Sequence, residues 1–403
     1  MDTAADRPTP LPTEPAAPAG NRLDILDALR GFALFGVLLA NILYWCGFVL
    51  MTEAQRVDVF GAEAMAWQHR LHLLLVDGKF YTLFSLLFGA GFAMQLARLS
   101  QRGHDGLRIY RRRVLVLLAI GLAHSWLVWD GDILVLYALL GLLLPLFHRW
   151  RDAWLLLAAG LLVFVVPFVG KALFAALGWA PHQALFAAGI AIGGAFGIEQ
   201  TPEYVLTWVQ REDWYAHVAW LASGPPFSWG LRLESWRLPK VLGIMLLGLW
   251  AGRRLAAGTL LGDRRLLWTV LLAGLAIGLP ASLVYASTPG HHQDSWASQV
   301  GTVPLALAYA SAFVLAWPWA RRWLGVLAAP GRMALTNYLA QSVVCSIAFL
   351  GVGLGWIGRV SFAEAYAFAV ALFVVQAVVS RWWLARHAQG PMEALWRRWT
   401  YGN

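Results

Sequence analysis

Cysteine and charged residues are both scarce in this chain. It has two cysteines, Cys46 and Cys345, among 403 residues, and only 13% of its residues are charged. Two cysteines in separate apolar segments define neither a disulfide framework nor a metal site. A soluble domain carries roughly 25% charged residues. The low charge therefore argues against a soluble protein.

Long apolar segments make up most of the sequence. The chain is 59% hydrophobic and its mean hydropathy is +0.59. Runs long enough to cross a bilayer recur along the whole length, which predicts an all-α polytopic membrane protein. We predict about ten transmembrane helices, at 31–50, 80–97, 114–129, 133–147, 153–178, 238–252, 266–286, 301–319, 333–350 and 362–384.

The basic residues orient the chain. Net charge is +9, and most of the 31 basic residues fall in segments that are internal if both termini are cytoplasmic. No basic patch lies on a soluble domain, so nucleic-acid binding is a poor alternative. We interpret residues 1–21 as a disordered cytoplasmic tail and 22–403 as one membrane domain. Within that domain, 179–237 is an outer or re-entrant segment, and whether 185–197 re-enters the membrane stays open.

The first predicted span, LDALRGFALFGVLLAN, carries charge where a membrane helix rarely does. Asp27 and Arg30 are three residues apart and share a helix face. Arg30 and Asn41 are eleven residues apart, about 16 Å along one stripe. Such a stripe faces the protein interior or a ligand. The alternative is an arginine that reaches the interface and an asparagine that packs helices together.

The stretch GLAHSWLVWDGDILVLYALLG places a histidine in an apolar span and two aspartates in the turn that follows. His124 is a proton carrier near neutral pH, and a carboxylate can orient its ring. Asp132 is our first choice for that carboxylate and Asp130 the second. An imidazolium in an apolar helix is costly, so we expect a neutral ring that can accept a proton. The alternatives are an interhelical hydrogen bond for the histidine and turn chemistry for the aspartates.

A late span, PGRMALTNYLAQSVVCS, repeats the pattern of the first. It has Arg332 at its inner mouth, followed by the amides Asn337 and Gln341 on one face. Lys79 stands at the outer start of the second span, where Gly89 and Gly91 predict close helix packing.

The segment 179–237 is rich in aromatic residues. Their spacing predicts one face of a short helix, formed by Tyr204, Trp208, Arg211 and Tyr215. Anchoring at the membrane interface and stacking against a sugar both account for this face.

Five motifs together resemble the YeiB-like family of bacterial multi-pass membrane proteins, a domain of unknown function. They are LDALRGFALFGVLLAN, KFYTLFSLLFGAG, GLAHSWLVWDGDILVLYALLG, GRMALTNYLAQS and QGPMEALWRRWTY, which run in order from about residue 23 to 401. The resemblance implies a location in the bacterial plasma membrane.

The opening Leu-Asp-x-x-Arg-Gly helix also resembles that of transmembrane acyltransferases, including the heparan-alpha-glucosaminide N-acetyltransferase group and the bacterial O-acyltransferases. That resemblance implies transfer of an acyl group from a cytoplasmic donor to a sugar on the far side. The O-acyltransferases have a histidine eleven residues after the motif arginine, and this chain has Asn41 there. Asn41 cannot act as the base, which leaves His124 as the candidate.

These observations predict a membrane acyltransferase that delivers an acyl group to a sugar or similar small-molecule acceptor at the outer face. Arg30, Arg332, Asn41, Asn337, Gln341 and Lys79 would bind the donor or line its path, and His124, Asp132 and Asp130 would form the catalytic group. Acyl-CoA would be a donor substrate, with no tightly bound cofactor and no metal. A transporter of a small organic anion and a non-catalytic scaffold are the alternatives, and a homodimer is compatible with the sequence.

Overall fold

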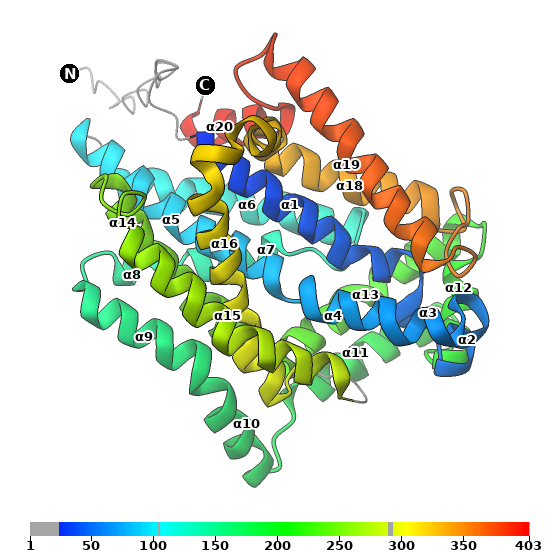
Figure 1. The fold of residues 1–403 in the computed structure, drawn as a ribbon. Helices are drawn as coiled ribbons and strands as arrows, with labels where there is room; N and C mark the ends of the chain where they lie inside the picture. Colours follow the sequence, from blue (N-terminus) through cyan, green and yellow to red (C-terminus); the bar gives the residue numbers. More distant parts are fainter. Residues whose placement is uncertain (1–23, 104, 289–292, 403) are drawn as a thin grey trace, which may run out of the picture.

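The structure, a computed structural model, describes residues 24–103, 105–288 and 293–402. The predicted tail, residues 1–21, lies outside the described residues. Every regular element within those ranges is a helix (Figure 1). The first half of the chain holds α1 (Asp24–Trp45), α2 (Glu53–Phe60), α3 (Ala62–Ala64), α4 (Arg70–Leu75), α5 (Lys79–Gln101), α6 (Gly106–Leu127), α7 (Leu134–Gly141), α8 (Leu144–Phe147), α9 (Asp152–Phe164), α10 (Val166–Ala176) and α11 (Pro181–Ala195). The second half holds α12 (Pro202–Val209), α13 (Trp214–Glu234), α14 (Arg237–Ala256), α15 (Arg264–Ser287), α16 (Trp296–Leu324), α17 (Ala328–Arg332), α18 (Ala334–Phe349), α19 (Phe362–Leu384) and α20 (Pro391–Tyr401).

Each of the ten predicted spans contains a helix, and about half of them are long and apolar enough to cross a membrane by themselves. Five helical segments meet that standard among the described residues, and α9 with α10, bent by 46°, makes a sixth. The remaining predicted spans correspond to α6, α7 with α8, α14 and α18. Short length limits α18 and the α7–α8 pair, and α14 carries basic residues at both ends. The chain is therefore a helical membrane protein.

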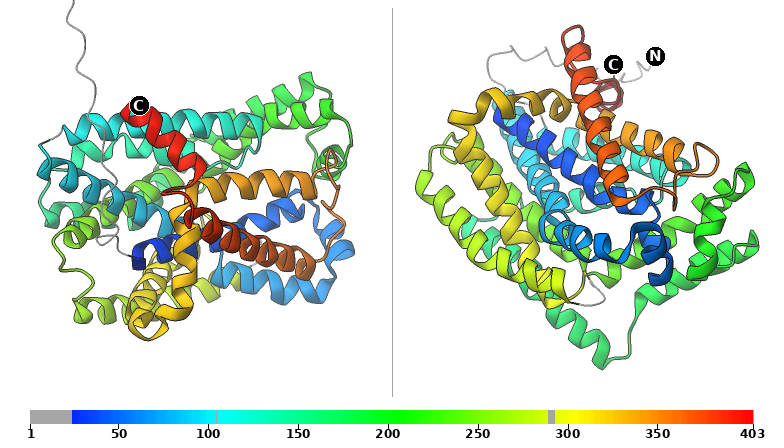
Figure 2. Two further views of the ribbon diagram at one scale, coloured as in Figure 1. Left: turned by 90° about the horizontal axis from the view of Figure 1, so that it is seen from above. Right: turned by 45° about the vertical axis from the view of Figure 1, so that its right-hand side comes forward.

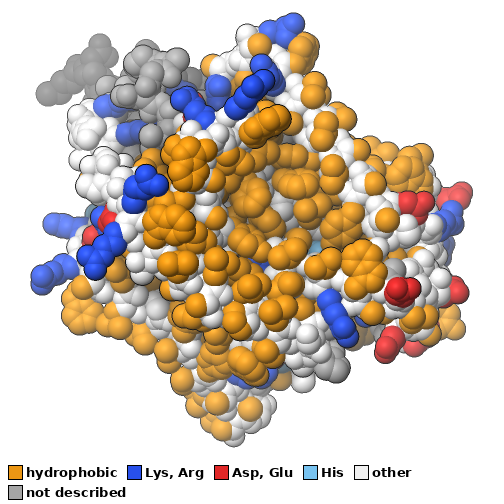
Figure 3. All heavy atoms as spheres, viewed as in Figure 1, with side chains coloured by type: hydrophobic (Ala, Val, Ile, Leu, Met, Phe, Trp, Pro, Cys, Tyr) orange, Lys and Arg blue, Asp and Glu red, His pale blue; other side chains and the backbone are white. Residues whose placement is uncertain are grey.

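The surface is divided by polarity. On the face drawn in Figure 3, Lys and Arg gather along the left and top, Asp and Glu gather at the right edge, and apolar side chains lie between. The right edge carries α2, α3 and α12 (Figure 1). Large apolar side chains are exposed on α15 and α19, such as Leu272 at 59% and Val378 at 64%. An apolar band between polar edges is what a bilayer requires of the protein that it surrounds.

Helix α1 lies in the middle of the molecule (Figure 1). It crosses α17 at backbone contact. A Cβ placed on Gly31 would lie 2.0 Å from the carbonyl oxygen of Leu327. A Cβ on Gly331 would lie 1.8 Å from the carbonyl oxygen of Asp27. Small residues at a crossing allow two helices to approach this closely. The two glycines bring the first and the fourth of the five motifs together.

Glycines also join α5 to α14. A Cβ on Gly89 would lie 2.0 Å from the carbonyl oxygen of Met245, and one on Gly248 would lie 2.2 Å from that of Leu86. Gly91, by contrast, has nothing within 4 Å of such a Cβ. The predicted close packing is confirmed for Gly89 and is wrong for Gly91, which points away from α14.

The segment 179–237 folds into α11, α12 and α13, and 185–197 lies mainly in α11, which pairs with α13. The predicted aromatic face is wrong, because α12 ends at Val209 and a new helix begins at Trp214. Asp213 caps that new helix by accepting a hydrogen bond from the backbone N–H of Ala216 at 2.7 Å. This bond, together with one from Arg211, lowers the pKa of the Asp213 carboxyl. The side chains of Trp208 and Tyr215 therefore belong to different helices.

The C-terminal helix α20 packs against α6 and α18 (Figure 2). The Trp396 indole donates to the backbone oxygen of Arg113 at 2.7 Å, and the Arg113 guanidinium lies 4.1 Å from the ring centre. Its Glu393 carboxylate accepts from the backbone N–H groups of Leu335 and Thr336. The helix is thus fixed to the bundle by polar contacts.

Candidate functional site

His124 and Asp132 form a buried pair where α6 ends and α7 begins. The Nδ1 of His124 lies 2.7 Å from one carboxylate oxygen of Asp132. The residues are 4% and 1% exposed. The other carboxylate oxygen accepts the backbone N–H of Val135 at 2.8 Å, which satisfies the first turn of α7. The hydrogen bond from Val135 therefore orients the Asp132 carboxylate toward His124.

The pairing determines which imidazole nitrogen is free. A carboxylate only accepts hydrogen bonds, so Nδ1 carries the hydrogen and Nε2 of a neutral ring is left as an acceptor. That Nε2 is buried and has no hydrogen-bond partner among the described residues. The rings of Tyr338 and Trp129 flank the imidazole, with centres at 5.4 and 6.5 Å. The group can accept a proton from a molecule that reaches it.

Two residues that the sequence analysis missed hold the loop that carries Asp132. Arg232 of α13 is buried, and its guanidinium donates to the backbone oxygen of Asp132. The Tyr338 hydroxyl of α18 accepts the backbone N–H of Ile133 at 3.2 Å. Arg232 stands out in the sequence as one cation in an aromatic stretch, whereas no sequence signal marks Tyr338.

Asp130 belongs to a separate cluster. Its carboxylate accepts a hydrogen bond from the Tyr44 hydroxyl at 2.7 Å, and that hydroxyl accepts one from the Trp220 indole at 3.1 Å. Gly224 of α13 lets the helix approach, since a Cβ there would lie 2.6 Å from that of Asp130. Of the two predicted aspartates, the structure therefore brings only Asp132 to His124.

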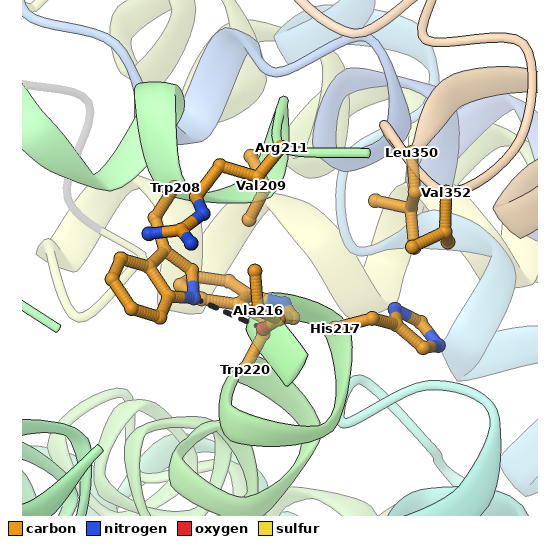
Figure 4. Close-up of a pocket in the computed structure, with 8 residues that line it drawn as sticks. All are labelled: Trp208, Val209, Arg211, Ala216, His217, Trp220, Leu350 and Val352. Atoms are coloured by element: carbon orange, nitrogen blue, oxygen red, sulfur yellow. Dashed lines mark hydrogen bonds between the residues drawn. The ribbon is translucent and has the colours of Figure 1, made fainter. Parts of the chain in front are cut away.

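A small pocket lies beside Trp220 at the outer segment (Figure 4). The Arg211 guanidinium lies 4.7 Å from the Trp208 ring centre, and the Trp208 indole donates to the backbone oxygen of Ala216 at 3.0 Å. His217 lies below Leu350 and Val352 on the other side of the pocket (Figure 4). Because Trp220 also bonds Tyr44, this pocket adjoins the Asp130 cluster.

The two predicted arginines flank the crossing of α1 with α17. Arg30 precedes Gly31 and pairs with Asp27 at 2.7 Å, with 30% of its side chain exposed. Arg332 follows Gly331 and donates to the backbone oxygen of Ala388 at 3.3 Å. The glycine contacts thus bring these two cations, which are about 300 residues apart in sequence, to the same end of the bundle.

The three predicted amide side chains differ in their hydrogen bonding within the described residues. Asn337 donates to the Ser380 hydroxyl at 2.9 Å, and Gln341 donates to the Gln376 side-chain oxygen at 2.9 Å. Gln376 in turn donates to the backbone oxygen of Asn337 at 3.0 Å, so these residues join α18 to α19. The Asn41 side chain is half-buried and makes no hydrogen bond with a described residue. Packing thus accounts for the later amides and leaves Asn41 available.

Lys79 is fully buried at the start of α5, and its ammonium donates to the backbone oxygen of Leu73 at 2.6 Å. It is the first residue of α5, directly after the Gly78 turn. Within the described ranges, no group of three His, Cys, Asp or Glu residues is arranged to hold a metal ion.

Comparison with known proteins places the chain in a family. Residues 251–403 match the family model described as protein of unknown function (DUF418). The chain is 30% identical over 389 residues to the uncharacterized protein YxaH of Bacillus subtilis (strain 168), covering 94% of each chain. It is 31% identical over 406 residues to the uncharacterized protein YeiB of Escherichia coli (strain K12), covering 93% of this chain and 95% of that one. As its five motifs predicted, the chain belongs to the YeiB-like family of proteins that contain DUF418.

Proposed function

We propose that the protein is a membrane acyltransferase, which moves an acyl group from cytoplasmic acyl-CoA to an acceptor at the outer face. The observation that carries the proposal is the buried His124–Asp132 pair, whose Nε2 has no partner among the described residues. A packing histidine normally satisfies its buried polar atoms. A general base must instead keep one nitrogen available for a substrate proton.

The reaction that fits this pair is attack of a hydroxyl or amine on the thioester carbonyl. As the new C–O or C–N bond forms, Nε2 of His124 takes the proton from the attacking atom. Asp132 holds the ring and stabilises the imidazolium that results. When the C–S bond breaks, the proton passes to the leaving CoA sulfur and the histidine is restored. Arg232 and Tyr338 keep the Asp132 loop in position.

The proposal requires ten passes, cytoplasmic termini and a bacterial inner-membrane location. Three observations support this arrangement: the helix in each of the ten predicted spans, the separation of basic from acidic edges in Figure 3, and the apolar band between them. In this arrangement α1 enters from the cytoplasm, and His124 lies near the outer end of α6. The pocket beside Trp220 is then open to an acceptor from outside.

Acyl-CoA would bind where α1 crosses α17. Arg30 and Arg332 stand at that crossing and would bond the phosphates of the donor. Asn41, whose amide makes no hydrogen bond with a described residue, lies further along α1 and would contact the acyl chain or its thioester on the way to His124. Asn337 and Gln341 would support that path by holding α18 against α19.

The test measures release of free CoA in inverted membrane vesicles, which expose the cytoplasmic face and retain native acceptors. Acetyl-CoA and longer acyl-CoAs are added to vesicles with and without the protein. We expect release that depends on the protein and falls about 10²-fold or more in His124→Gln, which keeps hydrogen bonding but cannot transfer protons. Asp132→Asn should also lower the rate.

The control is His387→Gln, which changes an exposed histidine just after α19 whose ring stacks on that of Trp383 with centres 4.0 Å apart. It should retain full activity, and the thermal stability of every variant is measured in parallel. Full activity in a well-folded His124→Gln would remove the histidine from the mechanism. Uptake of an organic anion without CoA release would instead favour a transporter.

A further inference from the structure

A second pocket, which does not include His124 or Asp132, lies where α5, α14 and α16 begin. Three interhelical connections meet there: the turn before α5, the turn before α14 and the loop before α16. Gly78 closes the first turn with φ +77, and a Cβ on it would lie 2.6 Å from the Thr302 methyl. The glycine therefore brings Asp77 and Lys79 directly against α16.

Cations outnumber carboxylates in this pocket. Arg237 and Lys240 line it together with Asp77, and the buried Lys79 lies two residues after Asp77 in sequence. With these side chains ionised, the three cations and one carboxylate carry a net charge of +2. The helices α5, α14 and α16 also begin here, and their amino ends add partial positive charge.

Both carboxylate oxygens of Asp77 already accept hydrogen bonds from the protein. The Tyr285 hydroxyl donates to one oxygen of Asp77 at 2.9 Å, and the Gln293 amide donates to the other at 2.9 Å. Arg237 donates to the side-chain oxygen of Gln293, and its guanidinium lies 5.1 Å from the Tyr81 ring centre. These contacts hold Asp77 and Arg237 in fixed positions.

Lys240 is different, because its ammonium has no hydrogen-bond acceptor among the described residues. It is 2% exposed, it lines the pocket, and it makes no hydrogen bond with a described residue. A buried ammonium without a partner is costly unless an anion joins it. The hydroxyl of Ser298 also lines the pocket and donates to no described residue. Two donors thus converge on a space beside Arg237.

We propose that this pocket binds a phosphate group, held by Lys240, Arg237 and Ser298. A phosphate monoester carries close to two negative charges at neutral pH, which matches the +2 of the pocket taken together with the neighbouring Lys79, whereas a carboxylate leaves one charge uncompensated. Several oxygens on one centre also suit donors that approach from different helices. The site does not depend on acyl transfer, and the phosphate belongs either to a soluble phosphate ester or to a lipid headgroup.

The test uses the full-length protein in nanodiscs of phosphatidylcholine. One arm adds sn-glycerol 3-phosphate or inorganic phosphate, with sodium chloride at equal ionic strength as the reference. The other arm replaces part of the phosphatidylcholine with phosphatidic acid, which has an exposed phosphate monoester. Thermal stability is recorded in both arms. We expect a rise in Tm that saturates in the first arm for a soluble ester, or a rise confined to the second arm for a lipid headgroup.

The variant Lys240→Met separates this site from a structural role. It keeps the length of the side chain and removes the unpaired charge, so we expect a higher Tm than wild type without phosphate and a Kd for phosphate weakened about tenfold or more. The control is Lys171→Met, an exposed lysine that pairs with Asp294 and should bind like wild type. A lower Tm for phosphate-free Lys240→Met, unchanged phosphate affinity in that variant, or no phosphate-dependent shift of the wild type in either arm would each overturn the proposal.

Discussion

The Glu393 carboxylate accepts a hydrogen bond from the Thr336 hydroxyl at 2.6 Å, across 57 residues of chain. The same carboxylate accepts the backbone N–H groups that begin α18, so it caps a helix to which it does not belong. We predict that Glu393→Ala lowers the free energy of unfolding by about 1–3 kcal/mol. Thermal denaturation in detergent measures the loss. Glu199→Ala removes an exposed glutamate and should leave Tm unchanged, and equal Tm values for both variants would contradict the cap.

Gly89 and Gly91 provide a matched pair in one helix. We predict that Gly89→Ala destabilises the protein by about 1–3 kcal/mol, because its methyl group would meet the backbone of α14. Gly91→Ala should be neutral or stabilise by up to about 1 kcal/mol, since alanine is the better helix former and the space is open. Denaturation of the two variants side by side tests the contact, and a reversed order of stability would show that α5 and α14 are arranged differently.

The membrane orientation can be tested with single cysteines, because Cys46 and Cys345 are fully buried. We predict that an impermeant maleimide labels Glu199→Cys in intact cells and does not label Gly262→Cys. Both positions are exposed, and they lie before α12 and α15, at opposite ends of the helices. Labelling of both after permeabilisation is the control. Labelling of Gly262→Cys alone in intact cells would show that the protein has the opposite orientation in the membrane.

The donor site is tested by equilibrium binding of acetyl-CoA to purified protein. We predict that Arg30→Ala and Arg332→Ala each weaken binding about tenfold or more, since each removes a charge-assisted hydrogen bond to phosphate. Arg321→Ala removes an exposed arginine at the same end, paired with Asp24 at 3.3 Å, and should bind normally. Absence of saturable binding to the wild type would end the donor hypothesis without affecting the phosphate pocket.

The amide pair between α18 and α19 has a measurable coupling. Gln341 and Gln376 bond each other at 2.9 Å inside the bundle. We predict that a double-mutant cycle of Gln341→Leu and Gln376→Leu gives a coupling of about 0.6–2 kcal/mol in stability, the range for hydrogen bonds between membrane helices. Little effect on CoA release should accompany it. Loss of activity with no coupling would mean that these amides contact the substrate.

Positions of helices could be predicted from the sequence because long apolar runs have few other structures available in a bilayer. The end of α12 was harder to predict from the sequence, since the spacing of Tyr204, Trp208, Arg211 and Tyr215 fits one continuous helix. It is Asp213, a capping residue between Arg211 and Tyr215, that starts a new helix. Periodicity alone does not detect such a break.

In the candidate site, too, some contacts could be predicted from the sequence and others could not. Asp132 lies eight residues from His124, so their contact could be predicted from a helix followed by a turn. Arg232 is separated from Asp132 by 100 residues, and the phosphate pocket gathers side chains from three distant connections. One sequence carries no signal for such convergence. The amides of α18 were visible as polar residues, but their partners on α19 could be identified only in three dimensions.

The crossing of α1 with α17 has a consequence for biosynthesis. Gly31 and Gly331 are separated by 300 residues, and a ribosome adds about 5–20 residues per second, so α1 waits roughly 15–60 s for its partner. During that interval a helix that bears Asp27 and Arg30 lies in the bilayer without the backbone that later covers it. The ion pair between these two residues, formed within one turn of the helix, is available from the start. It lets the first helix hold its charges together until the C-terminal third of the chain emerges.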